Sequence, residues 1–151
     1  MNLIDASAKG NLVEVVNFIS KGANIHINDD NALRDASYHG HFEVVKYLVE
    51  HGANIHALDD YALRMASYHG HDDVVKYLIA RGANIPACNN EALRYASMNG
   101  HVKVVKYLVE HGADIHAGDN KVFANASKNG HIEVLNYLQN VMLLEKLLEL
   151  K

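Results

Sequence analysis

The chain has 151 residues and a formal net charge of -4, which suits one domain and lacks the clustered cations of a broad nucleic-acid or anionic-membrane surface. Its one cysteine, Cys88, excludes an intramolecular disulfide and is compatible with a reducing compartment. No apolar run approaches the roughly 18 residues of a membrane span, and the first residues lack the layout of a signal peptide. We therefore expect an intracellular, cytoplasmic protein.

One sequence pattern recurs along the chain at intervals of 30 residues. The stretch Glu91–Ala117 returns with few changes at Tyr61–Ala87 and again at Asn31–Ala57. Such self-similarity indicates stacked units, each too small to bury its apolar face alone. We divide the chain into units of about 1–29, 30–59, 60–89, 90–119 and 120–140, which together predict one solenoid over residues 1–140.

Glycines divide each unit into two short helices. Two series recur every 30 residues: Gly10, Gly40, Gly70, Gly100 and Gly130, then Gly22, Gly52, Gly82 and Gly112. Because glycine closes helices in a left-handed conformation, we expect a first helix over about Ala32–Tyr38 and a second over about Phe42–Glu50. The second helix carries an apolar stripe at helical spacing, which predicts an all-α stack.

Polar residues lie ahead of each first helix. Asp30 and its copies Asp60, Asn90 and Asn120 are predicted N-caps. Arginine follows four residues later as Arg34, Arg64 and Arg94, a spacing that favours pairing within a helix. Two interpretations stay open for this arginine series: a structural guanidinium that ties connector to helix, or a row of cations for an acidic peptide or phosphate.

The end of the chain departs from the repeat. No glycine follows Asn140, and a leucine-rich segment continues, so we predict one long helix from about Ile132 to about Glu149. Residues 141–151 form its extension. They fit either a cap on the last unit or a self-association surface. The candidate residues for both interpretations are Val141, Leu144, Leu147 and Leu148.

The sequence predicts no catalytic residues, no metal site and no cofactor. Serines and histidines recur in register with the repeat, whereas a nucleophile is needed once, beside an oriented base. Copies in adjacent units should lie about 8–10 Å apart, too far to share a zinc ion whose ligands lie at about 2.0–2.1 Å. His41 and its copies are expected to begin the second helix and bond to local backbone.

Candidate partner-binding residues are those that differ between units. They cluster near the end of the first helix and one turn earlier, and include one connector residue: Tyr38, His39, Tyr68, His69, Met98, Asp35, Met65, Tyr95 and Tyr61. Aromatic and methionine side chains beside polar groups suit a recognition patch. Neutral drift on a solvent-facing surface is the alternative.

These repeats resemble the ankyrin repeat. The Gly-His pair, Val-Val-Lys-Tyr-Leu-Val-Glu and Gly-Ala-Asn-Ile-His-Ala match the family's second helix, helix end and connector, from Leu3 to Leu138. The usual repeat has about 33 residues and a different start. Three residues are missing between Ala57 and Leu63, so the resemblance implies shortened hairpin fingers. The compact form is similar to ankyrin proteins of giant DNA viruses of amoebae, which would place it in host cytoplasm.

The resemblance implies a non-catalytic scaffold that binds a protein partner on its concave face. The alternative function is structural: a self-associating protein that dimerises through the leucine-rich helix, which makes a homo-oligomer a second expected assembly. Neither nucleic acid nor membrane is an expected partner.

Overall fold

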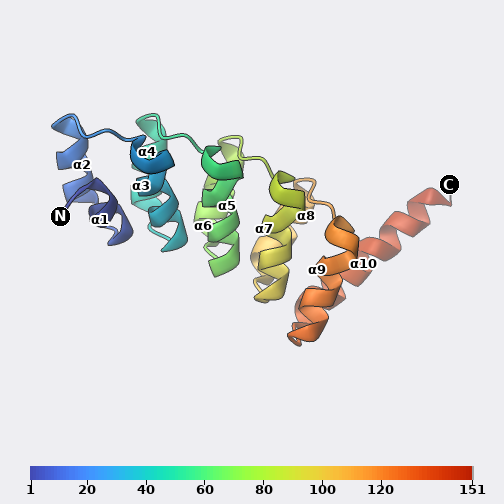
Figure 1. Cartoon of the computed structure of the whole chain (residues 1–151). Coiled ribbons are helices and arrows are strands. Elements are labelled where there is room, and N and C mark those ends of the chain that lie inside the picture. The colour runs from blue at the N-terminus through green and yellow to red at the C-terminus, as the bar shows by residue number, and fades with distance from the viewer. Residues whose placement is uncertain (151) are drawn as a thin grey trace.

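The computed structural model describes residues 1–150, and these residues form ten helices and no strand. Figure 1 shows the helices as a row of pairs that runs from the N-terminus to the C-terminus. The predicted all-α repeat solenoid is confirmed, and turns replace the hairpin fingers. The helices are α1 Leu3–Ala8, α2 Leu12–Ser20, α3 Ile27–Tyr38, α4 Phe42–Glu50, α5 Ala57–His69, α6 Asp72–Ala80, α7 Ala87–Met98, α8 Val102–Glu110, α9 Ala117–Lys128 and α10 Ile132–Glu149.

The helices stack in two parallel rows. The first helices of the units, α1, α3, α5, α7 and α9, pack against one another, and the second helices form the other row. Small side chains permit close packing in the first row, since Ala36 and Ser37 are fully buried. Leu33 and Val45 fill the space between the rows and are at most 1% exposed. Each unit therefore covers the apolar flank of the next, as the repeat predicts.

A left-handed turn opens each first helix from α3 onward. In α3 the residues Asn28, Asp29 and Asp30 have φ values of 52°, 55° and 55°, and the right-handed helix begins after them. Left-handed backbone costs roughly 1–2 kcal/mol per residue, and less for Gly, Asn and Asp. Most residues in these turns are Asn or Asp, but Leu58 and Cys88 also adopt this conformation, at φ values of 51° and 50°.

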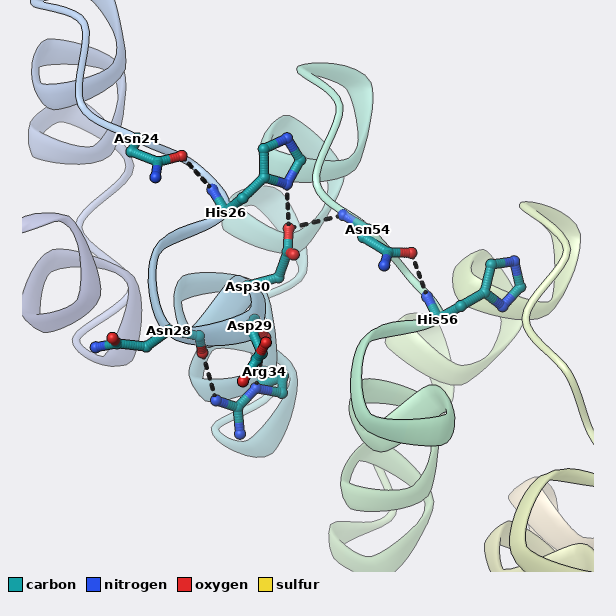
Figure 2. A network of polar contacts seen from close by, with 8 residues as sticks. All are labelled: Asn24, His26, Asn28, Asp29, Asp30, Arg34, Asn54 and His56. Carbon is teal, nitrogen blue, oxygen red and sulfur yellow. Dashed lines mark hydrogen bonds and ion pairs between the residues drawn. The ribbon is translucent and has the colours of Figure 1, made fainter.

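The N-cap prediction for Asp30 and its copies is wrong. An N-cap residue needs extended backbone, and Asp30 is left-handed instead. Its buried carboxylate accepts a hydrogen bond from the backbone N–H of Asn54 at 2.8 Å and lies 3.1 Å from Nδ1 of His26 (Figure 2). Asp60 repeats both contacts, with the backbone N–H of Asn84 in the following connector and with Nδ1 of His56 in its own turn. These aspartates therefore join neighbouring units.

His41 and its copies also join units, contrary to the expectation of local bonding. Nε2 of His41 donates to the carbonyl of Ala8 at 2.9 Å, and His71 donates to Tyr38, 33 residues earlier in the chain. The imidazole ring lies over the glycine that ends the preceding first helix. A Cβ on Gly40 would lie 2.4 Å from the His71 ring, so this glycine is needed for interhelix space as well as for its φ of 73°.

The last helix has the predicted bounds, and its end, from residue 141 on, continues past the solenoid as a tail. Val141 and Met142 pack against the core. The leucines that follow are exposed, namely Leu143 57%, Leu144 61%, Leu147 51%, Leu148 70% and Leu150 83%. These exposed fractions show that Leu144, Leu147 and Leu148 do not cover the last unit. In Figure 1 the end of α10 leads away from the other helices. Of the helices in the described residues, none has the length and apolarity to cross a membrane.

Candidate protein-binding surface

Five of the candidate binding residues meet around one pocket on the first-helix row. The tyrosine pocket, as we call it, has a volume of about 370 Å³. It spans residues from α3, α5 and α7, so no single unit could form it. Its lining residues are Tyr38, Tyr61, Arg64, Met65, Tyr68 and Tyr95.

Aromatic contacts between units hold the walls of the pocket. The rings of Tyr68 and Tyr95 meet edge to face, with centroids 5.3 Å apart and an interplanar angle of 87°. Tyr38 packs against His69 of the next unit at 4.2 Å. Such pairs contribute about 0.5–1.5 kcal/mol beyond area burial, so the walls are restrained before any partner arrives.

Tyr61 lies between two guanidinium groups. The guanidinium carbons of Arg34 and Arg64 are 5.4 and 5.3 Å from the centre of its ring. Both distances are within the range of a cation–π contact. One edge of the tyrosine pocket is therefore cationic, although the pocket itself is mostly aromatic.

The arginine series ties each first helix to its own left-handed turn. Nε of Arg34 donates to the carbonyl of Asp29 at 2.9 Å, and a terminal nitrogen donates to Asn28, also at 2.9 Å (Figure 2). Arg64 bonds to the equivalent carbonyls of its turn at 3.0 and 2.8 Å. The expected pairing with the Asp30 carboxylate is wrong, because that carboxylate faces the next connector. The contacts favour the structural interpretation of the arginines.

Glu91 connects two arginines beside the pocket. Its carboxylate accepts a hydrogen bond from Arg64 and lies 3.5 Å from Arg94. Burial disfavours the charged form of Arg64, but the bond to Glu91 and its charge outweigh burial and raise the pKa of Arg64. Burial, together with a hydrogen bond to Glu91, raises the pKa of Tyr95, so its phenol stays protonated at neutral pH.

The remaining candidate residues surround the pocket without lining it. His69 has a buried Nε2 with no hydrogen-bond partner, and burial lowers the pKa of its imidazole, which favours the neutral ring. His39 is exposed beside Tyr38, with ring centres 4.9 Å apart. Burial raises the pKa of Asp35. The backbone carbonyl of Met98 accepts bonds from the last unit, so its position also serves unit stacking.

The partner-binding residues predicted from the sequence do not include Arg64 or Glu91. Arg64 was considered only within its own unit, whereas its carboxylate partner lies 27 residues later. A comparison of each arginine with the residue 27 positions on gives Tyr61, Glu91 and Lys121 for the three units. That comparison would have shown a cation next to Tyr61 and an ion pair next to Tyr95.

In residues 1–150 no three His, Cys, Asp or Glu side chains gather closely enough to hold a metal ion. A larger hollow, of about 450 Å³, lies at the N-terminal end of the stack beside Leu3, Phe18 and Ile27. Its walls come from one end of the solenoid, while the tyrosine pocket lies where three units meet and where the units differ most.

Comparison with known protein families agrees with this architecture. Residues 3–89 match a family model described as ankyrin repeats in three copies, and residues 93–139 match one described as ankyrin repeats in many copies. A search of curated proteins found no match. Ankyrin repeats are generally modules of protein–protein interaction. The two matches together cover most of the sequence, and the chain belongs to the ankyrin repeat family.

Proposed function

We propose that the protein is a non-catalytic scaffold that binds a protein partner through the tyrosine pocket on its first-helix, concave side. The observation that carries this proposal is the convergence of Tyr38, Tyr61, Tyr68 and Tyr95 from three units around one 370 Å³ pocket. Tyrosine is enriched at the energetic centre of protein interfaces, because its ring is large and rigid and its hydroxyl can bond to a partner.

The charges around the pocket indicate how a partner would be oriented. Arg34 contacts the Tyr61 ring, and Asp35 lies beside it in α3. At the other end of the row, Lys121 and Lys128 are exposed on α9. Charges at the rim of an interface that complement those of the partner change the association rate and the binding register more than they change the affinity. The aromatic residues between them would supply most of the affinity.

Affinity capture with matched variants tests the proposal. Wild-type protein and the Tyr68→Ala variant are immobilised, and the captured proteins are compared by quantitative mass spectrometry. Tyr47→Ala is the matched control, since Tyr47 is half-buried in the second-helix row. We expect partners that wild type and the control retain and that fall at least tenfold with Tyr68→Ala. An unchanged set of proteins with Tyr68→Ala and with Tyr95→Ala would contradict the proposal.

A second candidate function, self-association, is favoured by the exposed leucines of α10. Removal of residues 141–151 separates the two functions, because this truncation leaves the tyrosine pocket intact. On the resemblance to viral ankyrin proteins, we further propose that the partner is a cytoplasmic protein of a host cell.

A further inference from the structure

The leucines of the tail are exposed, and Leu143 and Leu147 lie on the side of α10 that faces away from the solenoid. Val134 and Leu138 are the buried residues of α10. Leu143 and Leu147 each follow one of them by nine residues, which is two and a half turns of an α-helix. These two leucines therefore point opposite to core residues, and Leu144 and Leu148 lie on the flank between that side and the core side.

Charged residues occupy the side of the tail that continues the core face. Glu145 follows Leu138 by seven residues, close to two full turns, and Glu149 follows it by eleven. Glu145 reaches back to the solenoid, where its carboxylate lies 3.0 Å from Nε2 of His116. This contact fixes the rotation of the tail and presents the leucines outward.

We propose that the tail leucines bind the same leucines of a second copy, in an antiparallel two-fold pair of α10 helices. This inference rests on the second candidate function and specifies its interface. The leucines form two adjacent rows, Leu143 with Leu147 and Leu144 with Leu148. Antiparallel pairing centred between residues 145 and 146 places Leu143 beside the partner's Leu148 and Leu144 beside the partner's Leu147. The pattern is thus complementary to itself, as a two-fold interface requires.

The exposed area favours a second copy as the occupant of this face. Five leucines, each more than half exposed, form a patch of several hundred Å², the size at which an apolar surface marks an interaction site. Two such patches brought together approach the roughly 1,000 Å² at which specific interfaces begin. Only one cation, Lys146, lies among the described tail residues, beside Glu145 and Glu149, so the tail lacks the basic face of a helix that binds anionic lipid.

Antiparallel pairing is also favoured over parallel pairing. The face of α10 that bears the leucines carries Glu133 and Asn140 nearer its N-terminus. A parallel pair would bring each Glu133 toward its copy, whereas an antiparallel pair confines contact to the tails and opposes the helix dipoles. The two solenoids then extend in opposite directions, each with its own tyrosine pocket. A partner with two binding segments would gain avidity from both pockets.

Sedimentation equilibrium and light scattering on the full chain test the proposal. We expect wild type to have twice the 16.7 kDa mass of the chain and the Leu144→Asp/Leu148→Asp variant to have the monomer mass. Both leucines are exposed, so the helical circular dichroism and the melting temperature of this variant should stay unchanged. Lys146→Gln/Glu149→Gln is the control on the other side of the tail, and it should remain dimeric.

Four outcomes would overturn the proposal. These are a monomeric wild type at high concentration, a dimer that survives Leu144→Asp/Leu148→Asp, a mass that grows without limit, and a monomer that binds lipid vesicles through the tail. In a Cys88→Ser background, Leu143→Cys chains mixed with Leu148→Cys chains should cross-link on oxidation. Efficient cross-linking of Leu150→Cys to itself instead would indicate parallel pairing. Tyr68→Ala should leave the dimer intact, so failure of partner binding and failure of dimerisation remain distinguishable.

Discussion

The left-handed turns that open α5 and α7, the inner turns, have the same backbone conformation as the one that opens α9, the last turn, but different side chains support it. The turns that contain Leu58 and Cys88 place ordinary side chains at φ values near 50°, and an arginine of the following helix bonds to their carbonyls. The last turn has Gly118 at the equivalent position, and Ala124 replaces the arginine. Glycine adopts positive φ without a Cβ penalty. We infer that the arginine stabilises the turns in which an ordinary side chain has a positive φ.

The same contrast between inner and last units applies to the glycines that end the first helices. Gly70 and Gly130 have nearly equal φ values, 75° and 73°, but a Cβ on Gly70 would lie 2.4 Å from the His101 ring, and nothing lies near a Cβ on Gly130. Gly130→Ala should cost about 1 kcal/mol for its backbone alone. Gly70→Ala should cost about 3 kcal/mol, because overpacking adds to it. Urea denaturation measures both, and equal losses would contradict the role of the histidine ring.

Removal of an arginine tests whether its side chain stabilises an inner turn. Arg64→Met removes two bonds to turn carbonyls and the bond to Glu91, and we expect a loss of about 2 kcal/mol in the free energy of unfolding. Arg94→Met should cost less, since Nε of Arg94 has no partner and its bond to Cys88 is 3.4 Å long. Unchanged thermal unfolding of Arg64→Met with loss of a captured partner would instead assign the arginines to ligand binding.

Most of the fold was predictable because the same helix signals recur in each repeat. The glycine spacing gave the two helices of each unit, and the unbroken segment after Asn140 predicted α10 with the bounds that the structure has. The contacts between units were less predictable. Asp30 has the residue type and position of an N-cap, but its φ of 55° excludes that role. Its carboxylate instead accepts a hydrogen bond from the next connector. Local patterns do not report that backbone conformation.

The sequence singled out candidate residues for binding but did not show that five of them line one pocket. Differences between copies identified Tyr61 and Tyr68, because repeats conserve what stacking needs and leave the outward positions to vary. The pairing of Arg64 with Glu91 joins two units and is not visible inside either. The orientation of the tail leucines was readable from helical phase: Leu147 lies two and a half turns after Leu138.

Two substitutions that give the last turn the side chains of an inner turn test whether the arginine offsets strain in the turn. Gly118→Leu recreates the strained inner turn where no arginine supports it, and we expect a loss of about 1 kcal/mol. Its Cβ would lie 3.2 Å from Cδ of Arg94, a flexible side chain that can shift. Adding Ala124→Arg should recover much of this loss. A double-mutant cycle measured by urea denaturation gives the coupling, and zero coupling would mean that the arginine does not relieve strain in the turn.

The histidine that precedes each turn gives the smallest expected effect. His26 and His56 contact a buried aspartate of their own turn, whereas His116 contacts Glu145 of the tail. The hydrogen bond that His116 donates to the carboxylate of Glu145 raises the pKa of His116 above its usual 6.5. The stabilisation from this contact is therefore complete below pH 6.5 and is lost as the pH rises through the raised pKa. Both side chains are about half exposed, so salt should weaken the contact.

Imidazole shifts followed by NMR during a pH titration measure this contact directly. Glu145→Gln should lower the pKa of His116 toward 6.5, because the neutral amide no longer favours the protonated ring. Glu149→Gln is the matched control one turn later in α10, and it should leave the titration of His116 unchanged. If Glu145→Gln also left it unchanged, the tail would not be held against the last turn by this pair. Its leucines would then lack the fixed outward orientation that antiparallel pairing requires.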